Sequence, residues 1–114
     1  MKPTLSEAII KGCEGTQQCY ERLHFLDPDG QQHCCTIGAA AAGSRPEARD
    51  IAQLWAELRA GPDLFAVLHE LYPELVALAP EAGAMTLERQ IIYWNDTERL
   101  SREEIAAKVA AVGF

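Results

Sequence analysis

Residues 13–35 carry six side chains that could bind a metal or attack a carbon centre: Cys13, Cys19, His24, His33, Cys34 and Cys35. Thiolates and imidazoles are the ligands of tetrahedral zinc sites. The spacing contains neither C-x-x-C nor H-x-x-x-H, however, and free cysteine is among the residue types most often buried. We therefore expect structural thiols and no cofactor. The alternative is a zinc-binding or thiol-based protein that uses Cys13, Cys19, His33, Cys34 and Cys35.

A catalytic cysteine needs a depressed pKa, which a helix N-terminus or a nearby imidazolium supplies. Cys35 precedes a predicted helix in IGAAAA, and His33 would share its face of an extended strand. No recognised thiol-enzyme motif surrounds them, and the sequence has no Gly-rich phosphate loop, G-x-S-x-G elbow or H-E-x-x-H pair. A hydrolase or transferase site would require His33, Cys35 and Asp96 to converge. The sequence favours a protein without catalytic residues.

A β-hairpin near residues 20–36 must position most of these side chains. The segment Asp27-Pro28-Asp29-Gly30 is a turn signal, because proline presets φ and glycine accepts a positive φ. Residues 32–36 would form the returning arm. The alanine-rich segment IGAAAAG then predicts a short helix that another element can approach closely. Two strands alone are marginal in water, so we expect the hairpin to pack on helices.

Helix signals cover the rest of the chain. Capping-box pairs, in which two residues three apart satisfy each other's backbone N–H groups, predict helix starts. They occur at Thr4/Glu7, Ser44/Glu47 and Ser101/Glu104, and apolar periodicity predicts further helices over 51–58, 64–72 and 86–94. Pro73 should break the helix before it, 80–84 should be a loop, and Asn95 should be a left-handed stop. These signals predict a mostly α (α+β) fold: one compact domain, 1–114, of about five helices.

The charge balance restricts the partners. Seventeen acidic and ten basic side chains give a net charge of −7, which repels phosphate-rich polymers. The arginine pairs Arg45/Arg49 and Arg99/Arg102 make no basic stripe, so nucleic acid is disfavoured. The sequence shows neither a signal peptide nor a membrane span, which predicts a cytoplasmic protein with no membrane partner. We expect a protein partner, contacted by the aromatics Tyr20, Tyr72 and Tyr93.

Several short motifs share one order along the chain. They are Gly15-Thr16-Gln17-Gln18, Asp29-Gly30, CCTIGAAAA over 34–42, and YWND over 93–96 before a Ser-x-x-Glu helix. The order resembles a small uncharacterised helical domain family of bacteria and their phages, with a D-G…C-x-x-G-A and late N-D pattern. The resemblance implies a compact helical domain with a hairpin, encoded by a phage or mobile element, and directs attention to two segments, 35–39 and 94–96.

Both segments have a structural interpretation and a functional one. Gly38 would allow a close helix contact, and Asn95 with Asp96 would end a helix, because both side chains bond locally to the backbone. The functional interpretation is a cleft between the hairpin and residues 94–96. Its candidate binding residues are His33, Cys35, Gly38, Trp94, Asn95 and Asp96. With no catalytic motif and an acidic surface, the sequence favours a non-enzymatic interaction or regulatory module.

Overall fold

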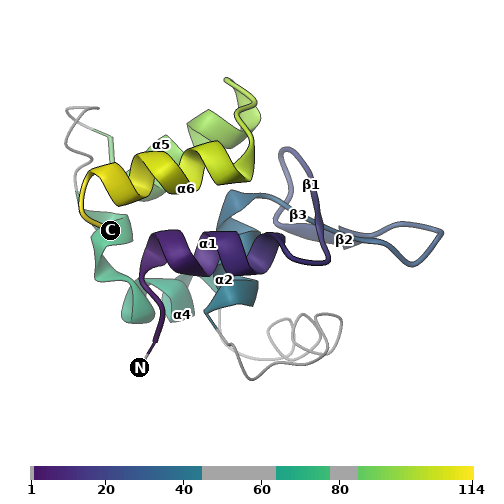
Figure 1. Ribbon diagram of the computed structural model, residues 1–114, viewed down its shortest axis with the longest axis horizontal. Helices are drawn as coiled ribbons and strands as arrows, with labels where there is room; N and C mark the ends of the chain where they lie inside the picture. Colours follow the sequence, from purple (N-terminus) through teal and green to yellow (C-terminus); the bar gives the residue numbers. More distant parts are fainter. Residues whose placement is uncertain (1, 45–63, 78–84) are drawn as a thin grey trace.

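The computed structural model describes residues 2–44, 64–77 and 85–114, and it has an α+β fold. Its elements, in order, are α1 (Leu5–Cys13), β1 (Gln17–Gln18), β2 (His24–Leu26), β3 (Gln32–Cys34), α2 (Thr36–Gly43), α4 (Leu64–Leu71), the 3-10 helix η1 (Pro73–Val76), α5 (Leu87–Asp96) and α6 (Arg102–Ala111). The small sheet extends from one side of the helical body (Figure 1). The predicted fold class is confirmed. The predicted helix over 51–58 and the loop over 80–84 lie outside the described residues.

Side-chain caps start the helices where the sequence predicts. In α1, Thr4 Oγ1 accepts from the Glu7 N–H at 3.2 Å, and Glu7 Oε1 accepts from the Thr4 N–H at 2.9 Å. Ser101 and Glu104 form the same reciprocal pair at the start of α6. Both capping boxes also place a carboxylate in the first helical turn, where the helix dipole favours negative charge.

The sheet contains the predicted hairpin and one additional strand. Strands β2 and β3 are antiparallel, and Asp27 Oδ1 accepts from the Asp29 and Gln31 N–H groups in the turn between them, each at 2.9 Å. The additional strand β1 pairs parallel with β3, so the order is β1-β3-β2. The sequence did not predict β1. It is two residues long, too short to show the alternating pattern that identifies strands.

Helices α1 and α2 pack backbone against backbone. A Cβ added at Gly12 would lie 1.8 Å from the Ala39 carbonyl oxygen, and one at Gly43 would lie 1.7 Å from the Ala8 carbonyl oxygen. All eight residues of α2 are buried. The alanine-rich sequence of α2 is thus required by the closeness of its neighbour, as its small side chains predict.

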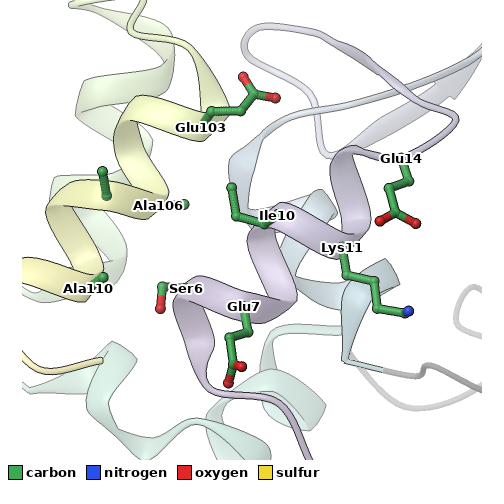
Figure 2. Close-up of a pocket in the computed structure, with 9 residues that line it drawn as sticks. Ser6, Glu7, Ile10, Lys11, Glu14, Glu103, Ala106 and Ala110 are labelled. Carbon is green, nitrogen blue, oxygen red and sulfur yellow. The ribbon is translucent and has the colours of Figure 1, made fainter.

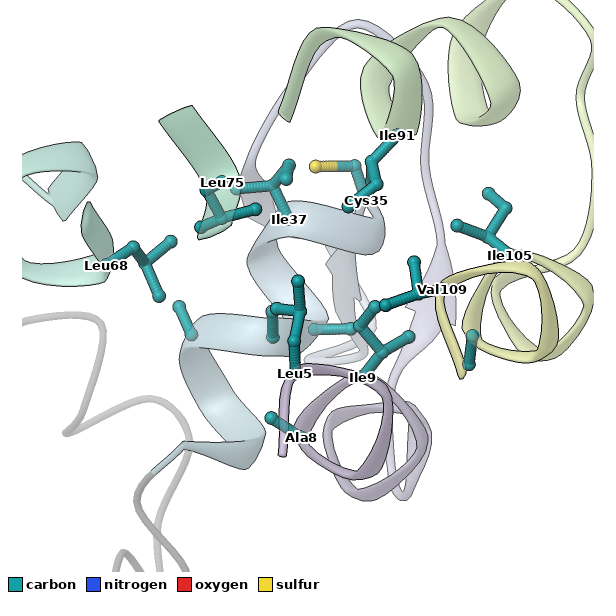
Figure 3. Close-up of a cluster of buried hydrophobic side chains, with 14 of the residues drawn as sticks. Leu5, Ala8, Ile9, Cys35, Ile37, Leu68, Leu75, Ile91, Ile105 and Val109 are labelled. Carbon is teal, nitrogen blue, oxygen red and sulfur yellow. The ribbon is translucent and has the colours of Figure 1, made fainter. Parts of the chain in front are cut away.

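The hydrophobic core joins α1 and α2 to the C-terminal helices. Side chains from six elements meet in it (Figure 3): Leu5, Ile9, Cys35, Ile37, Leu68, Leu75, Ile91, Ile105 and Val109. Pro73 ends α4 as predicted, because the chain continues from it as η1. Leu75 of η1 is completely buried, so the break in the helix still contributes to the core.

Two predictions about single residues are wrong. Tyr72 is only 1% exposed, because its ring packs in the core and its hydroxyl donates to the Pro3 carbonyl at 2.9 Å. It cannot be a surface contact in this fold. Asn95 is not a left-handed stop either, since α5 continues through Asp96 and the left-handed residue is Arg99, at φ 54°.

Within 2–44, 64–77 and 85–114, none of the helices combines the length and the apolar character needed to span a bilayer.

Candidate functional site

Asn95 is the centre of a buried hydrogen-bond network. It is 1% exposed in the last turn of α5. Its Oδ1 accepts from the Thr36 N–H at 3.1 Å, the Thr36 hydroxyl at 2.8 Å and Gln18 Nε2 at 3.0 Å. Its Nδ2 donates to the Cys19 carbonyl at 3.0 Å and to Asp96 Oδ1 at 2.7 Å. One amide therefore joins the end of α5 to β1 and to the start of α2.

Replacing Asn95 by alanine is expected to lower the free energy of unfolding by about 2–3 kcal/mol, because Thr36 and Cys19 would keep buried polar groups without partners. Chemical denaturation measures this change. The control is Thr97→Ala, at the exposed residue after α5, where we expect a change within about 0.5 kcal/mol. Equal effects of the two substitutions would contradict the network.

Asp96 and Cys35 line one cavity, of about 190 Å³, beside this network. Asp96 Oδ1 accepts from Asn95 and from the Glu21 N–H, at 3.0 Å. Glu21 has a left-handed backbone, with φ 62°, which aims this N–H at the carboxylate. The other lining residues are Glu21, Arg22, Leu23, Ile37 and Ile92. Of the six predicted binding residues, Cys35 and Asp96 line this cavity, and Asn95 holds Asp96 in place through its hydrogen bond.

Cys35 is the N-cap of α2. Its Sγ accepts from the Gly38 N–H at 3.4 Å, so a thiol takes the place that a hydroxyl or carboxylate usually occupies. Burial raises the pKa of this thiol to about 12, and the helix N–H contacts lower it less. The sulfur is therefore protonated at neutral pH and is a weak nucleophile.

The other predicted site residues lie elsewhere. The His33 Nε2 atom is 2.8 Å from Asp27 Oδ2, and its ring stacks on Phe25 with centroids 4.4 Å apart. This contact with His33 is the main reason why the pKa of Asp27 is lowered. Trp94 is 8% exposed and has the Lys108 ammonium over its ring. Gly38 has the structural role, because a Cβ there would lie 2.3 Å from the Leu23 carbonyl oxygen.

The five alternative zinc ligands do not converge on one centre. No group of three or more histidine, cysteine and acidic side chains in the described parts of the chain is placed to hold a metal. All four thiols are free; Cys13 donates to the Ile9 carbonyl at 3.1 Å and Cys19 to the Arg22 carbonyl at 3.3 Å. Burial raises the pKa of Cys13 to about 12 and that of Cys19 to about 11. Cys19, Cys34 and Cys35 belong to the hydrophobic core, and Cys13 packs against it.

Arg102 is a buried cation that the sequence did not reveal. It is 5% exposed, and its guanidinium donates to the Thr16 carbonyl at 2.9 Å, the Thr16 hydroxyl at 2.8 Å and the Cys34 carbonyl at 3.3 Å. It also lies 3.2 Å from Cys34 Sγ. It forms no ion pair with any carboxylate in the described segments. Arg102 therefore joins the residue before β1 to the end of β3 through their backbone carbonyls.

A second hollow of the surface, which we call the α1/α6 groove, has about 400 Å³ of space (Figure 2). Helix α1 contributes Ser6, Glu7, Ile10, Lys11 and Glu14, and helix α6 contributes Glu103, Ala106, Ala107 and Ala110. Ile10 is 45% exposed in it. The sequence analysis missed this groove because Ile10 lies outside the inward-facing set of α1, and only the position of α6 makes its surroundings concave.

No family model matches this sequence, and neither the curated proteins nor the solved structures gave a similar protein. The resemblance to a bacterial and phage domain family therefore stays a prediction.

Proposed function

We propose that this protein is a non-enzymatic interaction module that binds a helical segment of a partner protein in the α1/α6 groove. The observation that carries the proposal is that the exposed Ile10 of α1 faces the alanines of α6, which are Ala106, Ala107 and Ala110. Small side chains let a partner backbone approach closely, and amphipathic helices bind such grooves through apolar residues at every third or fourth position. The regulatory role and the phage or mobile-element origin implied by the motif order belong to this proposal.

The charge of the α1/α6 groove favours a basic partner. Three carboxylates, of Glu7, Glu14 and Glu103, surround it, against the one ammonium of Lys11. A twofold pairing of two copies of this chain would bring the same carboxylates toward each other, which is unfavourable. A helix with lysines or arginines beside its apolar face complements the surface. We therefore assign the groove to a basic amphipathic helix of another protein.

The direction of the helices locates the basic residues of that partner. The Ser6 N–H and hydroxyl, at the start of α1, bond to the Phe114 carbonyl beyond the end of α6, so the two helices are antiparallel. Glu14 and Glu103 consequently lie toward the same end of the groove (Figure 2). We expect the lysines of the partner at this end and its apolar residues over Ile10 and Ala106. The distance from Ser6 to Glu14 corresponds to about 12 Å of helix, or roughly two turns.

Replacing Ile10 by aspartate is expected to weaken binding of a basic amphipathic peptide at least tenfold. The main apolar contact of the groove is lost, and a carboxylate takes the place where an apolar side chain of the peptide would bind. The probe is a labelled helical peptide with leucines at every third or fourth position and lysines between them, and fluorescence anisotropy measures its Kd. Val76→Asp is the matched control, because Val76 is 54% exposed and lies outside the α1/α6 groove.

Two further measurements separate specific binding from general attraction to an acidic protein. The double variant Glu14→Gln, Glu103→Gln should weaken binding and reduce its salt dependence, since two carboxylates of the groove are neutralised. A peptide with glutamates in place of the lysines should not bind. Equal binding of both peptides, or equal loss with Ile10→Asp and Val76→Asp, would rule out the α1/α6 groove as the binding surface.

A further inference from the structure

The cavity beside Asp96 has the size and lining of a small-ligand site. It lies between residues 21–23, the start of α2 and the end of α5, and its volume of about 190 Å³ is below the roughly 300–1,000 Å³ of pockets for drug-sized ligands. Leu23, Ile37 and Ile92 give it an apolar floor. The space suits a ligand about as large as one amino-acid side chain.

The carboxylate of Asp96 is fixed in position with one oxygen available. Its Oδ1 accepts from Asn95 Nδ2 at 2.7 Å and from the Glu21 N–H at 3.0 Å. Its Oδ2 has no hydrogen-bond partner among the residues that the structure describes. Because Asn95 is itself held by Thr36 and Cys19, the carboxylate does not have to be ordered by a ligand. Such preorganisation lowers the entropy cost of binding.

The charges around the cavity favour a cation. Glu21 and Asp96 contribute two carboxylates, whereas Arg22 contributes one guanidinium. This guanidinium lies over the Phe25 ring, 4.9 Å from its centroid, and so is directed toward the hairpin. The Cys35 thiol is neutral, because burial raises its pKa to about 12.

We propose that this cavity binds a short aliphatic primary ammonium ion. The ammonium donates to Asp96 Oδ2, and the alkyl chain packs on Leu23, Ile37 and Ile92. An alcohol could also donate to this carboxylate, but only the ammonium adds the attraction between two opposite charges, so the carboxylate selects amines over alcohols. This site is separate from the α1/α6 groove and does not depend on the function proposed for it.

The test is a titration of the protein with n-butylammonium, followed by amide chemical shifts in NMR spectra. We expect saturable shifts at Leu23, Ile37 and Ile92 with a Kd on the order of 1 mM, and binding at least tenfold weaker for 1-butanol and for butyrate. Nα-acetyl-lysine amide distinguishes the source of the ammonium. Tighter binding of this compound than of butylammonium assigns the site to a lysine side chain of a partner, and weaker binding assigns it to a free amine.

Variants connect the binding to Asp96. Asp96→Asn retains an oxygen that accepts from Asn95 and Glu21, and it should weaken butylammonium binding at least tenfold. Glu98→Gln removes the same charge from an exposed residue outside the cavity and should leave the Kd unchanged. Ile92→Phe should also abolish binding, because it fills the apolar floor without altering the carboxylate. Equal affinity for butanol, unchanged binding by Asp96→Asn, or no saturable shifts in the wild-type protein would overturn the proposal.

Discussion

The substitution Gly12→Ala is expected to lower the free energy of unfolding by more than about 3 kcal/mol. The added Cβ would lie 1.8 Å from the Ala39 carbonyl oxygen and 2.4 Å from its carbonyl carbon. These are backbone atoms of a fully buried helix, so no side chain can rotate away to make room. Helices α1 and α2 would have to separate, and the core that they share would lose contacts. Thermal or chemical denaturation measures the effect.

The sign of this effect distinguishes packing from helix propensity. Alanine is a better helix former than glycine by about 1 kcal/mol, so a helix that touched nothing at this position would be stabilised. Lys11→Ala, at the neighbouring exposed residue of α1, is the control and should change stability by less than about 0.5 kcal/mol. Ala39→Gly should not rescue Gly12→Ala, because the clash is with the backbone of residue 39. A stabilised Gly12→Ala protein would show that α1 and α2 do not pack this closely.

Arg102→Met should cost about 2–4 kcal/mol of unfolding free energy, because the buried Thr16 carbonyl loses its donor, at about 1–3 kcal/mol, and the Cys34 carbonyl keeps only the Cys19 N–H. The Thr16 and Cys34 carbonyls both accept from this guanidinium. Methionine has a similar length and fills most of the space, so the loss reports on the hydrogen bonds more than on a cavity. Replacing both members of a buried ion pair by apolar residues is often neutral, because neither charge then has to be buried. Arg102 is a different case, since it forms no ion pair with an acidic side chain in the described segments.

Two controls make the Arg102 result interpretable. Arg89→Met removes the same charge from an exposed residue of α5 and should be nearly neutral. Amide hydrogen exchange should show lost protection at Cys19, the residue after β1, whose N–H bonds to the Cys34 carbonyl at the end of β3. If Arg102→Met were as stable as wild type, the guanidinium would not be what holds the two strands together.

The sequence predicted those elements whose signals are local. The reciprocal pairs Thr4/Glu7 and Ser101/Glu104 involve residues three apart, so the helix starts they form are visible in the sequence itself. The hairpin turn is equally local, because Asp27 bonds to backbone N–H groups two and four residues ahead. Each of these predictions needed no knowledge of how distant segments pack.

The features that were missed depend on distant partners. Arg102 is adjacent to a helix cap, where a charged residue normally faces solvent, and its burial follows from carbonyl groups 68 and 86 residues away. Tyr72 is buried because Pro3 supplies an acceptor for its hydroxyl. Asn95 and Asp96 were recognised as candidates, but their partners at residues 18, 19, 21 and 36 could not be inferred from turn preferences. The cavity beside Asp96 likewise exists only when three segments meet.

The native cysteines can report local unfolding of the protein without an added label. Cys19, Cys34 and Cys35 are buried, Cys13 is half-buried, and burial raises the pKa of all four thiols, so a reagent in solution meets protonated sulfurs, three of which are covered. Alkylation of the three buried thiols must wait until the surrounding structure separates. Because these three thiols lie just after β1, at the end of β3 and at the start of α2, the order in which they are alkylated records which contacts open first.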